Sequence, residues 1–161
     1  MAPRRARHPL TTTLKFKKLH EDVRLPEAQS GGAAGLDIRA HLPLPLYPDG
    51  LEIKSGGIVL VPTGFAMQID FGYEAQIRPR SGMAIKRGIT VINSPGTIDS
   101  DYRGEVKVGL INLSGDDQII ANGERIAQMV LAAVPRVEIQ VVEELDDSDR
   151  GEGGFGSTGS T

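Results

Sequence analysis

Turn-forming residues interrupt this chain so often that only short secondary-structure elements fit between them. The 161 residues include 20 glycines and 10 prolines. Between the turns lie short runs in which apolar side chains occupy every second position; Phe65, Met67 and Ile69, for example, alternate with small or polar residues. That period is typical of β-strands with one buried face. Many short strands at close spacing predict a single all-β domain, a sandwich or a barrel.

The alternating pattern and the turns define where strands are expected. The expected strands are 14–19, 36–40, 58–64, 65–71, 74–78, 89–96, 105–114, 124–134 and 138–145. Residues 83–88 are expected to hold one helical turn, and the proline-rich stretch 41–50 a connection or an edge. The stretch 124–134 is apolar on both faces except at Gln128, which predicts a strand buried on both sides at a subunit contact. Five acidic residues within 143–149 predict a solvated linker after the last strand.

Charge and cysteine content narrow the classes of function. The formal net charge is -3, and only the first ten residues are locally basic. A basic stripe for nucleic acid is therefore missing, so we expect neither a nucleic-acid nor a membrane partner. The chain has no cysteine, which excludes disulfides, thiolate metal sites and a cysteine nucleophile and fits a reducing, cytoplasmic location. Residues 1–12 are expected to form a disordered basic tail.

Four internal stretches carry residues suited to chemistry. They are AAGLDIRA (33–40), RPRSGMA (78–84), NSPGTIDSDYRG (93–104) and GERIAQMV (123–130). Arginines offer a planar fork of donors to phosphate oxygens, and an acidic loop with an aromatic residue can hold a general base beside a stacking surface. Taken one at a time, the same residues fit ordinary turns, a surface loop and a structural hydrogen bond for Gln128.

A fifth stretch, RGEGGFGSTGST (150–161), contains the spacing G-x-G-x-x-G at Gly151, Gly153 and Gly156. In a dinucleotide-binding fold this motif follows a strand and begins a helix. Here it follows the acidic linker, and no helix pattern comes after it. The stretch is therefore interpreted as a glycine-rich arm whose backbone N–H groups can wrap a phosphate chain, and not as a Rossmann turn.

In order along the chain, A-G-L-D, P-R-S-G-M-A, G-T-I-D-S-D-Y-R-G, G-E-R-I-A-Q-M and R-G-E-G-G-F-G-S-T-G resemble the five motifs of the trimeric dUTP pyrophosphatases (dUTPases). The resemblance runs from about residue 14 to the C-terminus. Two small departures are Leu36, where the family often has tyrosine, and a longer connection around LPLPLYPDG. Neither departure changes a residue expected to take part in the chemistry.

The resemblance implies a fold and an activity. The fold is an eight-stranded, jelly-roll-like β-domain over residues 13–145, followed by an acidic linker and mobile lid over 146–161. The assembly is a homotrimer whose active sites are each built from three subunits. The reaction is hydrolysis of dUTP to dUMP and pyrophosphate with Mg²⁺ on the triphosphate, which keeps uracil out of DNA and supplies dUMP for dTMP synthesis.

The resemblance also implies a role for each matching residue. Asp99 would orient and deprotonate the attacking water, Tyr102 would pack on the deoxyribose, and Asn93 would read the uracil with the backbone of its strand. Gln128 would contact the α-phosphate and the water, and Asp37 would support hydrated Mg²⁺ from the second coordination shell. The other implied substrate contacts are Arg80, Ser81 and Gly82 on the phosphates, with Ser81 near the bond that breaks; Gly96 and Thr97; and, in the lid, Arg150, Phe155, Gly156, Ser157 and Thr158.

Two other functions were weighed against this one. A dCTP deaminase, or a bifunctional deaminase–dUTPase, shares the fold, but the resemblance to that family would require a catalytic glutamate, and none lies between Ile89 and Ile98. A nucleotide-sensing or protein-binding module on the same fold would need no catalysis, whereas all five motifs are intact. The products formed from dUTP, dCTP and dTTP with Mg²⁺ separate these alternatives.

Overall fold

The protein was analysed as a computed structural model that describes residues 12–149, 151 and 152. These residues form ten strands and one short helix. The elements are β1 (Lys15–Lys18), β2 (Leu36–Arg39), β3 (Leu51–Ile53), β4 (Ile58–Gln68), β5 (Tyr73–Arg78), α1 (Ser81–Arg87), β6 (Ile89–Val91), β7 (Gly96–Ile98), β8 (Glu105–Asn112), β9 (Gln118–Ile120) and β10 (Arg125–Ala133). The all-β prediction is confirmed. No helix in this part of the chain is long and apolar enough to cross a membrane.

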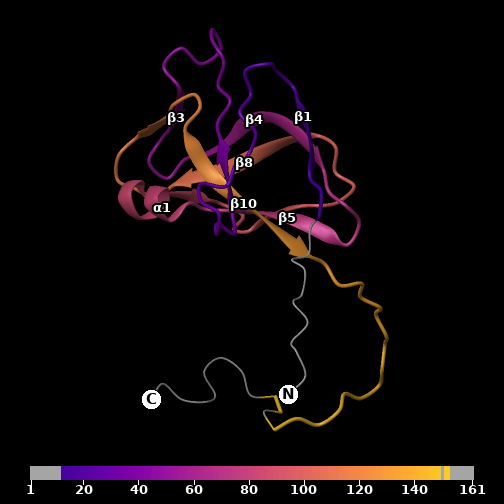
Figure 1. Cartoon of the computed structure of the whole chain (residues 1–161). Helices are drawn as coiled ribbons and strands as arrows, with labels where there is room; N and C mark the ends of the chain where they lie inside the picture. The colour runs from indigo at the N-terminus through magenta and orange to yellow at the C-terminus, as the bar shows by residue number, and fades with distance from the viewer. Residues whose placement is uncertain (1–11, 150, 153–161) are drawn as a thin grey trace, which may run out of the picture.

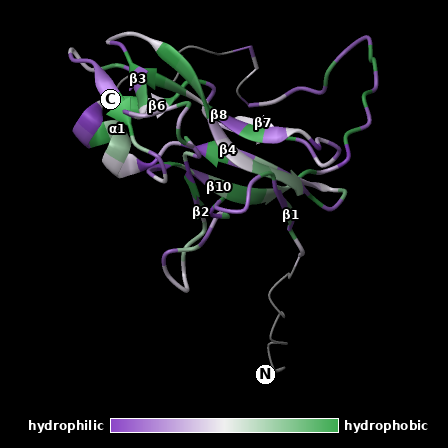
Figure 2. Cartoon of the chain, turned by 90° about the horizontal axis from the view of Figure 1, so that it is seen from above, coloured by the Kyte–Doolittle hydropathy of each residue, from purple (hydrophilic) through white to green (hydrophobic). Residues whose placement is uncertain are grey.

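The strands form two four-stranded antiparallel sheets and one two-stranded sheet. The strand orders are β1-β4-β8-β6, β2-β10-β5-β7 and β3-β9. In Figure 1, β4 and β8 of the first large sheet lie over β10 and β5 of the second. A single cluster of buried apolar side chains joins them, with Val61 and Leu110 from the first sheet and Ile38 and Met129 from the second. The architecture is therefore a β-sandwich, and hydrophobic residues gather in its strands while hydrophilic residues gather in its loops (Figure 2).

Most strands lie where the alternating pattern placed them, but several differ. The expected strand 89–96 is correct only over β6 (Ile89–Val91), because residues 92–95 form a turn and Gly96 begins β7. The stretches 58–64 and 65–71 were expected as separate strands, but they form the single strand β4. The register of β4 against β8 shifts between Pro62 and Ala66, so a bulge lets the strand bend and continue through its glycine. Three strands of three residues each, β3, β7 and β9, were not predicted, because so short a run shows no periodicity. The helix α1 has seven residues and is longer than the single turn expected.

The expected strand 138–145 is wrong for this chain, since the structure has no strand after β10. The segment leaves the sandwich as an extended chain (Figure 1). Its apolar side chains lie in solvent; Val141 is 97% exposed and Ile139 is 88% exposed. A strand needs a hydrogen-bonding neighbour, and none of the described strands pairs with this segment.

The strand expected over 124–134 is confirmed as β10, but its burial is less complete than predicted. Ile126, Ala127 and Met129 are buried, whereas Gln128 and Val130 are only partly covered. Within one chain, therefore, the second face of β10 is half-buried. The proline-rich stretch 41–50 contains no strand and serves as a connection, as expected.

The bulge in β4 depends on Gly64, which adopts a left-handed backbone conformation with φ of +74°. Its N–H donates to Oε1 of Glu105 (2.9 Å), and its carbonyl accepts the N–H of Leu19 (2.8 Å). A Cβ at this position would lie 2.5 Å from Cγ2 of Val23 and 2.8 Å from Cγ of His41. Only glycine therefore satisfies both the backbone and the packing at this bend.

We expect Gly64→Ala to destabilise the protein more than Gly56→Ala. Gly56 has a similar φ of +72°, but a Cβ there would meet no atom within 4 Å. Gly56→Ala should cost about 1 kcal/mol of unfolding free energy from backbone strain alone. Gly64→Ala should cost a further 1–3 kcal/mol, roughly, because the new methyl overpacks a rigid site. Urea denaturation at equal protein concentration checks this, and equal losses for the two variants would contradict it.

Candidate functional site

The carboxylate of Asp37 brings three of the sequence motifs together. Its Oδ1 accepts a hydrogen bond from Nε of Arg80 (3.2 Å), and its Oδ2 accepts one from Nη1 of Arg125 (3.0 Å). Nη1 of Arg80 also donates to the backbone carbonyl of Arg125 (3.1 Å). The Asp37 side chain is only 13% exposed, whereas those of Arg80 and Arg125 are 26% and 39% exposed, so the carboxylate is covered while both guanidinium groups stay partly open to solvent. One carboxylate thus balances and orients two guanidinium groups.

Strand pairing places Gln128 beside this cluster. On β10, Gln128 lies opposite Asp37 of β2 on one side and Arg78 of β5 on the other. Its Nε2 donates to the carbonyl of Pro79 (2.9 Å). A Cβ on Gly35 would lie 2.5 Å from Oε1 of Gln128. Glycine at position 35 therefore leaves the space that the carboxamide occupies.

The turn into α1 completes this group, which we call the arginine cluster: Asp37, Arg80, Ser81, Gly82, Arg125 and Gln128. Arg80 has extended backbone angles, and the helix begins at Ser81. Ser81 and Gly82 are exposed, and a Cβ on Gly82 would meet no atom within 4 Å. Donors at this turn are therefore open to a ligand.

Arg125 is a member that sequence reasoning missed. It stands in the same G-E-R-I-A-Q-M motif as Gln128, which was singled out because it interrupts an apolar strand. Arg125 and Asp37 are 88 positions apart, so the motif itself carries no signal that their side chains meet. Only the pairing of β10 with β2 shows that the two residues meet.

A second group surrounds the loop after β7. Thr97, Asp99 and Tyr102 line a hollow of about 490 Å³ together with Leu60 and Lys107. The hydroxyl of Tyr102 donates to the carbonyl of Glu105 (3.0 Å). A Cβ on Gly104 would lie 2.5 Å from this hydroxyl, so the ring can occupy its place only above a glycine. This group, which we call the nucleoside-side hollow, presents a carboxylate beside an aromatic ring.

Gly96 begins β7, and Asn93 lies in the turn just before that strand. Nδ2 of Asn93 would be 3.2 Å from a Cβ on Gly96, and its Oδ1 would be 3.7 Å from a Cβ on Gly109 of β8. The Asn93 carboxamide is exposed and lies near two strands that belong to different sheets.

The two groups are far apart within one chain. Gln128 of β10 pairs with Arg78 of β5. Ile98 of β7 pairs with Ala75 of β5, so Asp99, one residue further on, is level with Glu74, which pairs with Ala132 of β10. The four residues from position 128 to position 132 correspond to about 13 Å of extended strand. One chain therefore cannot place Asp99 and Gln128 on the same small group of atoms.

The remaining residues expected in the site lie outside the described part of the chain. They are Arg150, Phe155, Gly156, Ser157 and Thr158. The expected basic tail also lies outside it, except for Thr12.

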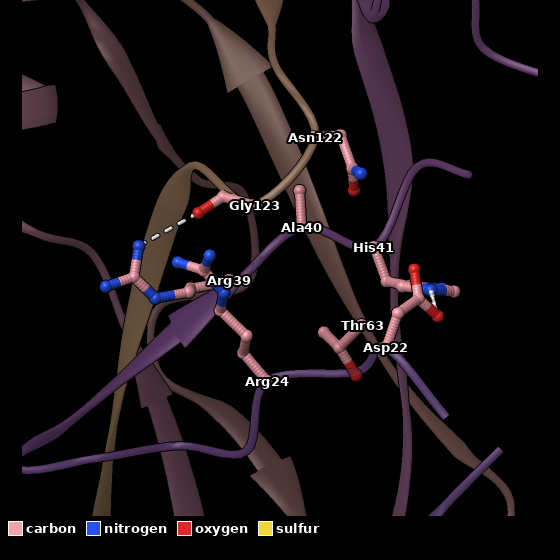
Figure 3. Close-up of a pocket in the computed structure, with 8 residues that line it drawn as sticks. All are labelled: Asp22, Arg24, Arg39, Ala40, His41, Thr63, Asn122 and Gly123. Carbon is pink, nitrogen blue, oxygen red and sulfur yellow. Dashed lines mark hydrogen bonds and ion pairs between the residues drawn. The ribbon is translucent and has the colours of Figure 1, made fainter. Parts of the chain in front are cut away.

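A further hollow of about 300 Å³ contains none of the residues expected in the site (Figure 3). Its polar groups largely bind each other. Nε2 of His41 lies 3.1 Å from Oδ1 of Asp22, and this hydrogen bond lowers the pKa of Asp22. Nη1 of Arg39 donates to the carbonyl of Gly123 (2.9 Å), and Oδ1 of Asn122 accepts the N–H of Leu42 (2.8 Å). These contacts attach the loop before β10 to the end of β2.

The described residues offer little for direct coordination of a metal. They contain no group of three or more histidine, cysteine, aspartate or glutamate side chains suited to hold an ion. The oxygens of Asp37 are of the type that Mg²⁺ prefers, but each already accepts a hydrogen bond from an arginine. The arrangement fits a metal held mainly by ligand oxygens and water, with Asp37 nearby.

Comparison with known proteins gives one consistent family. Residues 21–159 match the family model described as dUTPase. The deoxyuridine 5'-triphosphate nucleotidohydrolase of Syntrophotalea carbinolica is 49% identical over 150 residues, which cover 92% of this chain and 98% of that protein. That of a Hydrogenobaculum species is 54% identical over 146 residues, which cover 91% and 97%.

Solved structures agree with the family in fold. A mutant dUTPase of Staphylococcus bacteriophage 80alpha with dUpNHpp has a TM-score of 0.81 and 26% identity, covering 92% of this chain and 99% of that one. A mutant dUTPase from phage phi11 of S. aureus, described with a structural Mg(II) ion, is 22% identical, with a TM-score of 0.71 and coverage of 84% and 100%, and supports the fold alone.

We expect Gly35→Ala to disturb Gln128 while leaving the fold intact. The new methyl would overlap Oε1 of Gln128, a flexible side-chain end that can swing away but loses its bond to Pro79. The loss of one hydrogen bond should cost about 1 kcal/mol or less. Side-chain amide NMR of Gln128 should shift, with a small change in melting temperature. Gly32→Ala, at a position open to solvent, is the matched control; an unmoved Gln128 signal in Gly35→Ala would contradict the steric argument.

Proposed function

The chain belongs to the dUTPase family and is a dUTP nucleotidohydrolase, and we propose that it attacks the α-phosphate with a water molecule activated by Asp99. A bond forms between the water oxygen and the α-phosphorus while the bond to the bridging oxygen of the β-phosphate breaks. The water proton passes to the Asp99 carboxylate, and the products are dUMP and pyrophosphate. No covalent enzyme intermediate is needed.

The observation that carries this proposal is the arginine cluster. Arg80, Ser81 and Gly82 are proposed to hold the phosphates, with Ser81 near the bond that breaks. Gln128 is proposed to contact the α-phosphate and the attacking water. Because the protein is net negative and the substrate is a polyanion, local cations must outweigh the overall charge. Arg80 and Arg125, held in place by Asp37, are suited to that task.

Mg²⁺ is proposed to bind the triphosphate, where it neutralises phosphate charge. Asp37 would support the hydrated ion through water and not by direct coordination. This role fits a carboxylate that is largely buried and already bonded to two arginines. The two guanidinium groups hold the Asp37 carboxylate in one orientation through hydrogen bonds to both of its oxygens.

The nucleoside is proposed to bind at the nucleoside-side hollow. Tyr102 would pack on the deoxyribose and leave no room for a 2′-hydroxyl, supported by its bond to the Glu105 carbonyl. Asn93, in the turn before β7, would read the uracil edge with the backbone of β7, and Gly96 and Thr97 would add contacts along that strand. A pocket of backbone groups rejects cytosine because the exocyclic amine replaces an acceptor with a donor.

The C-terminal residues are proposed to close over the bound triphosphate. Their glycines would let backbone N–H groups approach the phosphates, Arg150 would add positive charge at the γ-phosphate, and Phe155 would stack on the uracil. Gly156, Ser157 and Thr158 would supply the remaining donors. A lid of this kind excludes water from the reacting centre.

A homotrimer with shared active sites is proposed because one chain separates Asp99 from Gln128 by about 13 Å along the sheet. Assembly would place the nucleoside-side hollow of one subunit against the arginine cluster of another. The exposed apolar side chains after β10 and the half-buried second face of β10 provide surface for such contacts. In the cell, we propose a cytoplasmic enzyme that keeps uracil out of DNA and supplies dUMP for dTMP synthesis.

Asp99→Asn is expected to remain folded and assembled but to hydrolyse dUTP about 10²–10⁴-fold more slowly, because a positioned general base is lost. Asp101→Asn, in the same loop, removes an equal charge and should keep turnover close to that of the unmodified protein. Pyrophosphate release from dUTP with Mg²⁺ measures both. Release at the unmodified rate from Asp99→Asn would remove that residue from the mechanism.

Mixing two inactive variants tests whether sites are shared. Asp99→Asn and Gln128→Ala chains, co-refolded at equal amounts, should regain roughly one quarter of full activity. A shared site needs intact Asp99 from one chain and intact Gln128 from its neighbour, and in a randomly mixed trimer each of these conditions is met about half of the time. Each variant refolded alone is the control. Mixed trimers verified by native mass spectrometry that show no regained activity would mean that Asp99 and Gln128 act from the same chain.

A further inference from the structure

The side chain of Arg87, the last residue of α1, binds three acceptors in the segment that leads into β10. Its Nη1 donates to Oε1 of Glu124 (2.5 Å), its Nε to Oε1 of Gln118 (3.0 Å) and its Nη2 to the carbonyl of Ile119 (2.8 Å). The Arg87 side chain is 30% exposed and that of Glu124 is 26% exposed. All of its nitrogen atoms are therefore engaged with a single neighbouring segment.

Glu124 is held equally firmly from the other side. Its Oε2 accepts the N–H of Ala121 (3.0 Å), and its backbone carbonyl accepts the N–H of Ala40 (2.9 Å). The N–H of Gly123 donates to the carbonyl of Ala40 (2.8 Å). The loop before β10 is thus fixed to the end of β2 and gives Arg87 a rigid partner.

The helix itself has few other attachments. Of its residues only Met83 is buried, and Ser81, Gly82, Ile85 and Lys86 are exposed. Its N-terminal end lacks a side-chain cap, and Gly88 closes its C-terminal end. Because a seven-residue helix is marginal by itself, its position depends on the contacts of its side chains.

Each partner in this ion pair adjoins a part of the arginine cluster. Arg87 lies six residues after Ser81 on the same short helix, about 9 Å along its axis. Glu124 directly precedes Arg125 and lies four residues before Gln128. The pair therefore connects the turn that carries Arg80 and Ser81 to the strand that carries Arg125 and Gln128.

We propose that Arg87 and Glu124 are positioning residues for dUTP hydrolysis, which set the turn at Arg80–Gly82 at the correct distance from Arg125 and Gln128. The inference rests on the proposed roles of those residues. Neither Arg87 nor Glu124 touches the substrate. Their ion pair acts on the rate of the chemical step, because a displacement of about 1 Å in a catalytic group can cost about 100-fold in rate.

A purely structural role predicts a different outcome. Partly exposed ion pairs contribute little to folding stability. A structural pair would therefore change the melting temperature slightly and leave turnover per folded trimer unchanged. Lys54 offers a control for the loss of an exposed ion pair, since it binds Glu52 (2.7 Å) and Asp117 (2.9 Å) and no residue of the arginine cluster, and these partners raise its pKa to about 12.

The experiment measures kcat and KM for dUTP with Mg²⁺, melting temperature and trimer mass for Arg87→Met, Glu124→Gln, the double variant and Lys54→Met. Arg87→Met should lower kcat between about 10- and 100-fold, with a smaller change in KM, because the nucleoside binds elsewhere. The double variant should be little slower than Arg87→Met, which shows that the two residues act as one unit. Lys54→Met should lower the melting temperature slightly and leave kcat unchanged.

Arg87→Lys refines the test without removing the charge. Lysine can pair with Glu124 but lacks the planar fork that also reaches Gln118 and Ile119, so it should recover part of the lost kcat. The inference is overturned if Arg87→Met keeps kcat within twofold, or if kcat falls only in step with the loss of folded trimer. It is overturned together with the proposed function if the unmodified protein does not hydrolyse dUTP.

Discussion

The hydrogen-bonded pairing of β10 with β2 on one side and β5 on the other is the constraint on which the rest of the molecule depends. It puts Gln128 level with Asp37 and Arg78 and brings Arg125 to the Asp37 carboxylate. The buried side chains of Ile126, Ala127 and Met129 fix this register. A slip by one residue would turn Gln128 into the core and expose its apolar neighbours. The same packing that stabilises the fold therefore aligns the arginine cluster.

The charged side chains of the arginine cluster hold one another in fixed orientations through ion pairs. Two guanidinium groups close together repel each other, and the largely buried Asp37 offsets this repulsion while fixing their direction. A polyanionic substrate bound there, as proposed, would meet donors that are already oriented, so little of its binding energy would be spent on ordering side chains. The exposed Ser81 and Gly82 leave the approach to these donors open.

Much of this architecture can be read from the sequence, and the failures have physical causes. The apolar run 124–134 predicted β10, and its polar interruption singled out Gln128, which lies opposite Asp37 in the arginine cluster. Strand β7 was missed because Gly96, Thr97 and Ile98 are too few to show a period. The pattern over 138–145 is a strand pattern, but pairing depends on a neighbour that periodicity cannot supply. The separation of Asp99 from Gln128 and the meeting of Arg87 with Glu124 depend on topology, which joins residues far apart in sequence.

The distance between Asp99 and Gln128 within one chain has a consequence for how activity depends on abundance. In the proposed trimer a single folded chain carries both halves of a site but has no complete site of its own. Enzyme activity would then rise more steeply than protein concentration near the dissociation constant of the assembly. Synthesis of new chains would add little hydrolysis until enough have accumulated to associate. Dilution would remove activity without unfolding any chain.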